Sequence, residues 1–176
     1  TSCLQVYSQA GTCSNPTWAS EACCQLSEGM NLVRSFAYGG SSWAFDHLLT
    51  IDNTEIPVLQ NSGWTELCNP HYGPSDLCGG SNGDGPFMLY PSAGTDRTAL
   101  YRCYTGVNHF FSMYPDCEGT TVESVLGYAS TQRTSETPRP LRRCFNSSQN
   151  VHFHWLNEHC PQDPAISEEG ILGYVK

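Results

Sequence analysis

The sequence predicts an all-β, disulfide-rich fold made of three internal repeats. A Leu-x-Arg-(Ser/Cys)-aromatic pattern occurs three times, each time followed by a histidine in an apolar run and by an apolar stretch that ends in Tyr. The predicted strands are short, and no segment keeps a helical apolar period over three turns. Because one repeat cannot bury its apolar face alone, the copies must pack together. Pseudo-threefold packing predicts a β-trefoil-like barrel or, alternatively, a small propeller-like ring.

The repeats divide the 176 residues, which we expect to form a single domain, into four parts. An N-terminal Cys-rich segment spans 1–31, and the three copies span 32–95, 96–137 and 138–176. The first copy is the longest, and a run of Gly, Pro, Ser, Asn and Asp places its insertion at 68–85. The repeat-equivalent residues are the arginines Arg34, Arg102 and Arg143, the histidines His47, His109 and His152, and the closing tyrosines Tyr90, Tyr128 and Tyr174.

Each element follows from a local pattern. The strongest helical segment is 20–27, because Ser20 can cap its first turn. Short apolar runs that end at turn residues predict strands. These strands are expected at 100–104, 109–113, 122–128, 152–156 and 171–175.

Ten cysteines indicate an oxidising compartment, and the chain starts at Thr1 without an apolar leader, as expected of a mature secreted protein. The sequon at Asn146 predicts a glycoprotein. Equivalent spacing in copies two and three predicts one disulfide inside each copy, while the absence of a Cys-x-x-Cys pair argues against zinc. The predicted disulfides are Cys103–Cys117, Cys144–Cys160 and Cys68–Cys78, with Cys3, Cys13, Cys23 and Cys24 pairing among themselves.

The charge balance limits the partners. Seventeen acidic and eight basic residues give a net charge of −9, and Lys176 is the only lysine. Such a surface repels phosphate groups, so nucleic acid and anionic membranes are not expected partners. No apolar run approaches the roughly 20 residues of a membrane span. The expected partner is an extracellular glycan or protein, and the oligomeric state is left open.

Several stretches resemble a secreted-protein repeat of unknown function from bacteria, fungi and animals. Its copies read roughly Leu-Tyr-Arg-x-Tyr, His-Phe-Tyr-(Thr/Ser) and Glu-Gly-x-x-Gly-Tyr-Val. Copy one departs from it, with 85–90 where the Glu-Gly motif belongs. Such repeats are often attached to secreted enzymes, so the resemblance, which covers 32–176, implies a lectin-like accessory role and supplies no catalytic residues. The matching stretches are Leu100–Arg102, His109–Ser112, Glu123–Tyr128 and Glu169–Val175.

Aromatic residues beside amides and carboxylates are the candidate ligand site. Flat aromatic faces stack on the C–H groups of sugar rings, and the amides bond their hydroxyls. The stretch 60–66 and the neighbourhood of Trp43 have this composition, and Tyr38 is a further aromatic of this kind. For any single Trp, core packing is the commoner use, because this side chain buries a large apolar area. The candidate ligand-binding residues are Trp43, Asn61, Trp64, Glu66, Tyr72 and Trp155.

The equivalent histidines either converge on a metal ion or hold one copy against the next. We favour the second use, because no carboxylate accompanies all three, and we assign no metal or cofactor. The loop 76–84 offers oxygen ligands for calcium, but it lacks the spaced acids of an EF-hand. The arginines are expected to pair with carboxylates of their own copy, such as Glu123 and Glu169. His154 has no counterpart and is expected to be exposed.

The predicted function is binding of an extracellular ligand, with carbohydrate favoured. No Gly-x-Ser-x-Gly or His-Glu-x-x-His motif is present, so an enzyme is not expected. The first alternative is a structural or interaction protein, either a matrix or egg-fluid component or an inhibitor or toxin module, with 68–85 as its contact loop. The second alternative is a secreted hydrolase that uses two of the scattered carboxylates.

Overall fold

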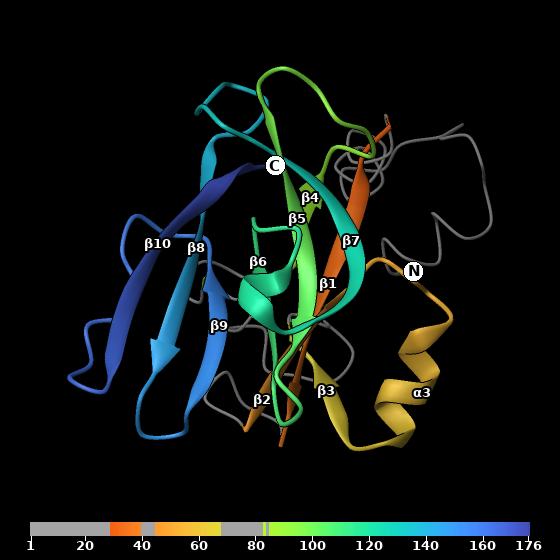
Figure 1. Ribbon diagram of the computed structural model, residues 1–176, viewed down its shortest axis with the longest axis vertical. Coiled ribbons are helices and arrows are strands. Elements are labelled where there is room, and N and C mark those ends of the chain that lie inside the picture. The colour runs from red at the N-terminus through yellow and green to blue at the C-terminus, as the bar shows by residue number, and fades with distance from the viewer. Residues whose placement is uncertain (1–28, 40–44, 68–82, 84) are drawn as a thin grey trace, which may run out of the picture.

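The computed structural model describes residues 29–39, 45–67, 83 and 85–176, and this part of the chain is mostly β-strand (Figure 1). Among the described residues, no helix has the length and apolar character needed to cross a membrane. The elements are β1 (Asn31–Tyr38), β2 (Asp46–Thr50), α3 (Glu55–Asn61), β3 (Trp64–Glu66), β4 (Phe87–Leu89), β5 (Arg97–Tyr104), β6 (His109–Ser112), the 3-10 turn η2 (Cys117–Gly119), β7 (Thr121–Ser130), β8 (Arg139–Asn146), β9 (Val151–Trp155) and β10 (Ile166–Val175).

The strands form two antiparallel sheets that curl around one core. One sheet has the order β2-β1-β3, with β4 also paired to β1, and the other has the order β6-β5-β7-β10-β8-β9. The edge strands β6 and β9 contact each other, and both contact β2 of the other sheet. At the opposite end, the Met88 amide donates to the Lys176 carbonyl (2.9 Å), and Tyr90 and Tyr128 exchange two backbone hydrogen bonds. The sheets therefore meet at both ends of the core.

The predicted strands are confirmed, whereas α3 was not predicted. The five expected strand segments coincide with β5, β6, β7, β9 and β10, although 109–113 and 152–156 each run one residue past the end of the observed strand. The predicted helix 20–27 lies outside the described residues. Helix α3 has only seven residues, too few to produce a sustained amphipathic period.

The three histidines occupy matching register positions. His47, His109 and His152 pair with Ala37, Tyr104 and Phe145 of the preceding strands. They are therefore equivalent in the structure as well as in the sequence.

The alignment of Arg34 with Arg102 and Arg143 is wrong by one residue. The strand residues paired with the histidines give a common reference point in each copy. The residue two positions before this point is Ser35 in copy one, Arg102 in copy two and Arg143 in copy three. Arg34 therefore matches Arg142. The buried face sets this register, because a one-residue slip turns every side chain to the other face. The residues that point into the core from the first strands are Val33, Leu100 and Leu141.

The closing tyrosine of copy one is also misassigned. Phe87 pairs with Val33, as Gly127 pairs with Leu100 and Gly173 with Leu141. Met88, not Tyr90, therefore matches Tyr128 and Tyr174. The Tyr90 ring instead packs 3.6 Å from the Arg97 guanidinium, and its hydroxyl donates to Glu136 (2.8 Å).

Two residues expected near the surface are buried. His154 is fully buried between Phe87 and Phe111, and its Nε2 lies 2.9 Å from the Gly85 carbonyl, so its predicted exposure is wrong. Trp155 is only 7% exposed, in a cluster with Phe153, Cys144 and Cys160. It is therefore a core residue and not part of a ligand surface.

Both predicted disulfides of the described region are present, Cys103–Cys117 and Cys144–Cys160. Each joins the first strand of a copy to the turn after its second strand. Each disulfide stabilises the fold by about 3 kcal/mol, because the closed loop restricts the conformations of the unfolded chain. The other six cysteines lie outside the described residues.

Candidate functional site

A pocket of about 390 Å³ opens beside β3. Helix α3 packs against β3 and lies on the far side of the molecule from β8–β10 (Figure 1). The described lining residues are Gln60, Asn61, Trp64, Thr65 and Glu66. The structure therefore brings the stretch that the sequence favoured for sugar binding into one concave site.

A short helix and a glycine turn build the pocket wall. The Asp52 carboxylate accepts hydrogen bonds from the amide and hydroxyl of Thr54 just before α3 begins. The helix ends where the Ser62 amide bonds the carbonyls of Val58 and Leu59. Gly63 follows with φ +88°, a left-handed conformation that only glycine adopts readily. This turn reverses the chain so that Trp64 starts β3 beside the helix end.

Trp64 is partly exposed and is held by aromatic neighbours. It pairs in register with Tyr38 on β1, and the two rings meet edge to face at 5.5 Å between centroids. Tyr38 is itself 45% exposed. On another side the His109 ring lies 5.7 Å away, also edge to face. These contacts fix the indole while part of it stays open to the pocket.

Glu66 lines the pocket, but its carboxylate is already paired. Arg34 Nε and Nη2 each lie 2.5 Å from one Glu66 oxygen, and the Glu66 side chain is only 7% exposed. A bidentate pair of this kind is among the strong hydrogen bonds in proteins. Glu66 is therefore not the open sugar-binding carboxylate that the sequence predicted. It fixes one wall of the pocket and leaves that wall without net charge.

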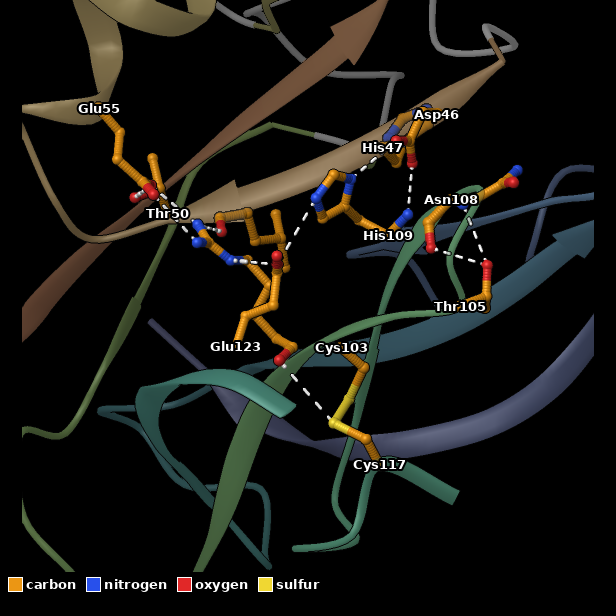
Figure 2. Close-up of polar contacts among 12 residues, drawn as sticks. Asp46, His47, Thr50, Glu55, Cys103, Thr105, Asn108, His109, Cys117 and Glu123 are labelled. Carbon is orange, nitrogen blue, oxygen red and sulfur yellow. Dashed lines mark hydrogen bonds and ion pairs between the residues drawn. A yellow bond between two sulfur atoms is a disulfide. The ribbon is translucent and has the colours of Figure 1, made fainter. Parts of the chain in front are cut away.

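A network of ion pairs joins copy one to copy two behind this site (Figure 2). Arg102 on β5 donates to both Glu55 oxygens (2.8 and 3.0 Å) and to the Leu49 carbonyl (3.2 Å). The Thr50 hydroxyl bonds the same Glu55. Arg102 Nε lies 3.0 Å from Glu123 of its own copy, as predicted.

The same contacts recur between copies two and three. Arg143 donates to Glu118 (2.6 and 3.3 Å) and to the Phe111 carbonyl (3.1 Å). Ser112 bonds Glu118 as Thr50 bonds Glu55. Arg143 Nε lies 2.8 Å from Glu169. Each arginine therefore links its own copy to the preceding one.

Between copies three and one, the two described positions that match this ion pair carry neither arginine nor glutamate. Ser35 stands in copy one where copies two and three have Arg102 and Arg143. In copy three, Pro161 follows Cys160 as Glu118 follows Cys117. The buried Ser35 hydroxyl has no hydrogen-bond partner among the described residues. Since both positions are uncharged, neither one leaves a charge without its partner.

Two of the three equivalent histidines bridge to carboxylates of other strands or loops. His109 Nδ1 lies 2.7 Å from Asp46 of copy one, and its Nε2 lies 3.5 Å from Glu123 (Figure 2). His152 Nε2 lies 3.4 Å from Glu169, whereas His47 is buried. Within the described ranges, no group of three or more His, Cys, Asp or Glu side chains is placed to hold a metal ion. The contacts of His109 correspond to the structural use that the sequence favoured.

Acid is expected to destabilise these junctions. The hydrogen bond from Arg102 holds the pKa of Glu55 below its ordinary 4.5, and the one from Arg143 does the same for Glu118. A carboxylate with a lowered pKa in the folded state adds stability that is complete above pH 4.5 and lost as the pH falls through the folded-state pKa. The thermal midpoint should therefore fall between pH 6 and pH 3, and less steeply in Arg143→Met. An equal slope in that variant would exclude Glu118 as a cause, and an equal slope in Arg102→Met would exclude Glu55.

Asn146 is buried, and its amide bonds Gln149 while its Oδ1 accepts from the Ser148 amide. A glycan at this predicted sequon would require the turn to open. The other candidates, Trp43, Tyr72 and most of the 76–84 loop, lie outside the described residues.

No family model, curated protein or solved structure matches this chain.

Proposed function

We propose that this protein is a secreted, lectin-like carbohydrate-binding protein and that the pocket beside β3 is its binding site. The observation that carries the proposal is the meeting of Trp64 with Gln60 and Asn61 in one open cavity. Its volume of about 390 Å³ is in the range of small-molecule sites, about 300–1,000 Å³. Two disulfides suit an extracellular protein.

The chemistry of the pocket suits a sugar ring. An indole face packs against the C–H groups of a pyranose, and the edge-to-face contact with Tyr38 keeps that face in place. Amide side chains offer both donors and acceptors, as the hydroxyl groups of a sugar require. Binding without turnover is the role proposed for this site.

We further propose that residues 32–176 are three copies of the secreted repeat described above in a β-trefoil-like arrangement. Three equivalent histidine registers support it. So do the mutual contacts of β2, β6 and β9, the second strand of each copy. The repeated Arg–Glu junctions are a third support.

Replacing Trp64 by alanine tests the binding site. We expect Trp64→Ala to lose most of the affinity for glycans that the wild type binds, because the substitution removes the aromatic face on which the sugar ring stacks. Trp64→Phe should retain part of it. Binding is measured first on a glycan array and then by calorimetry with the strongest hits.

Trp155→Phe is the matched control, since this tryptophan is buried and lies outside the pocket lining. It should bind as the wild type does. Unchanged binding by Trp64→Ala would place the site elsewhere. Absence of binding to every glycan on the array, with the protein folded, would overturn the proposed function.

A further inference from the structure

We infer that the pocket accepts one neutral saccharide per chain and excludes acidic sugars such as uronic acids and sulfated or sialylated glycans. This inference rests on the proposed function and defines its ligand class. Two observations carry it: the state of every arginine in the protein, and the residues that match Trp64 in the other copies.

All seven arginines of the chain are described, and each is already engaged. An acidic sugar is usually held by a guanidinium fork. Arg133 is the one exposed arginine, but it is paired with Glu158 and lies outside the pocket lining. Five face carboxylates, in the pairs Arg34–Glu66, Arg102–Glu55, Arg133–Glu158, Arg142–Glu168 and Arg143–Glu118. The other two are held by neighbours: Arg97 by the Tyr90 ring and the Ser92 carbonyl, and Arg139 by the Lys176 carbonyl.

The arginine nearest the pocket cannot change partners at low cost. Both Glu66 oxygens are bound by Arg34, and both side chains are almost buried. An acidic ligand would have to displace Glu66 and leave that carboxylate buried without its partner, which is strongly unfavourable. The net charge of −9 adds long-range repulsion.

The described side chains that line the pocket, apart from the paired Glu66, are all uncharged. Gln60 and Asn61 each present an amide, and Thr65 presents a hydroxyl. Such groups match ligand hydroxyls without requiring an ionic partner. A neutral sugar ring stacked on Trp64 satisfies the site, whereas a carboxylate or sulfate finds no counter-charge among the described lining residues.

The site occurs in copy one and is not repeated at the matching positions. Ile166 occupies the register of Trp64 in copy three. In copy two, Thr120 occupies it, one residue before Thr121, the residue at which the pairing of β7 with β5 ends. A 3-10 turn held by the Cys103–Cys117 disulfide replaces α3 in copy two. Neither place offers an indole beside a helix end. The predicted stoichiometry is therefore one ligand per chain.

Matched neutral and acidic oligosaccharides test the ligand class. The array should carry β-mannan beside oligomannuronate and oligogalacturonate beside its carboxyl-reduced neutral form, with sulfated and sialylated glycans added. We expect every hit to be neutral and calorimetry on the best hit to give one site per chain. Binding to an acidic member as tight as to its neutral counterpart, or two or more sites, would overturn the inference while the proposed function stands. No binding at all would overturn both.

A charge placed in the pocket provides the converse test. Asn61→Arg adds a guanidinium at an exposed lining position and should raise affinity for the acidic counterpart of the best neutral ligand about fivefold, the scale of one solvent-exposed ion pair. Asn53→Arg makes the same change at an exposed position before the other end of α3. It should have no such effect. Equal gains in both variants would show that overall charge, and not the pocket, excludes acids.

Discussion

Gly127→Ala and Gly173→Ala are expected to be among the most destabilising single substitutions in this protein. Both glycines have positive φ, +144° and +149°, where an L side chain is strained. A Cβ on Gly127 would lie 2.8 Å from the Leu89 Cβ and from the Tyr90 carbonyl oxygen. On Gly173 it would lie 2.6 Å from the Ala129 Cβ. Neither glycine can gain a methyl group unless neighbouring strands move apart.

The expected loss combines backbone strain of about 1–3 kcal/mol with overpacking of about 1–3 kcal/mol. Gly170→Ala separates the two effects. Gly170 has φ +130°, yet a Cβ there meets nothing within 4 Å. Urea denaturation with the disulfides intact should show a larger loss for Gly127→Ala and Gly173→Ala than for Gly170→Ala. Equal losses would mean that close packing at these glycines is unimportant.

Removing either junction arginine is the second substitution with a large expected effect. Arg102→Met leaves Glu55 and Glu123 without the cation that both face, and Arg143→Met does the same to Glu118 and Glu169. Losing one partner of a buried pair costs about 3–5 kcal/mol, and losing one of a surface pair costs about 0–1 kcal/mol. Since the carboxylates here are partly exposed, we expect each variant to lose about 2–3 kcal/mol of unfolding free energy, a value between these two limits.

Arg133→Met is the matched control for these variants. Its pair with Glu158 is exposed, with side-chain exposures of 46% and 62%. Its unfolding free energy should stay within about 0.5 kcal/mol of the wild type. If Arg102→Met and Arg143→Met were as mild as Arg133→Met, the Arg–Glu contacts would not hold the copies together.

The candidate pocket could be predicted to a large extent because its residues are neighbours in the sequence. The stretch 60–66 carries an indole, amides and a glycine turn within seven positions, and the pocket is lined from that stretch. The part that failed depends on contacts across the sheet. Glu66 is paired with Arg34, 32 positions earlier. Trp155 is buried against the Cys144–Cys160 disulfide, which joins β8 to the turn after β9. Neither contact can be inferred from the residues that are adjacent in the sequence.

The sequence alone determined the all-β class, the two disulfides of copies two and three, and the equivalence of the three histidines. These depend on local alternation and on repeated spacing. Only the tertiary structure decided which residue of copy one matches which in the others. The register there is set by burial of Val33, not by the identity of Arg34. A Leu-x-Arg match in the sequence does not show which face of the strand is buried. In the folded protein, a shift of the strand register by one residue would expose the apolar core side chains to solvent.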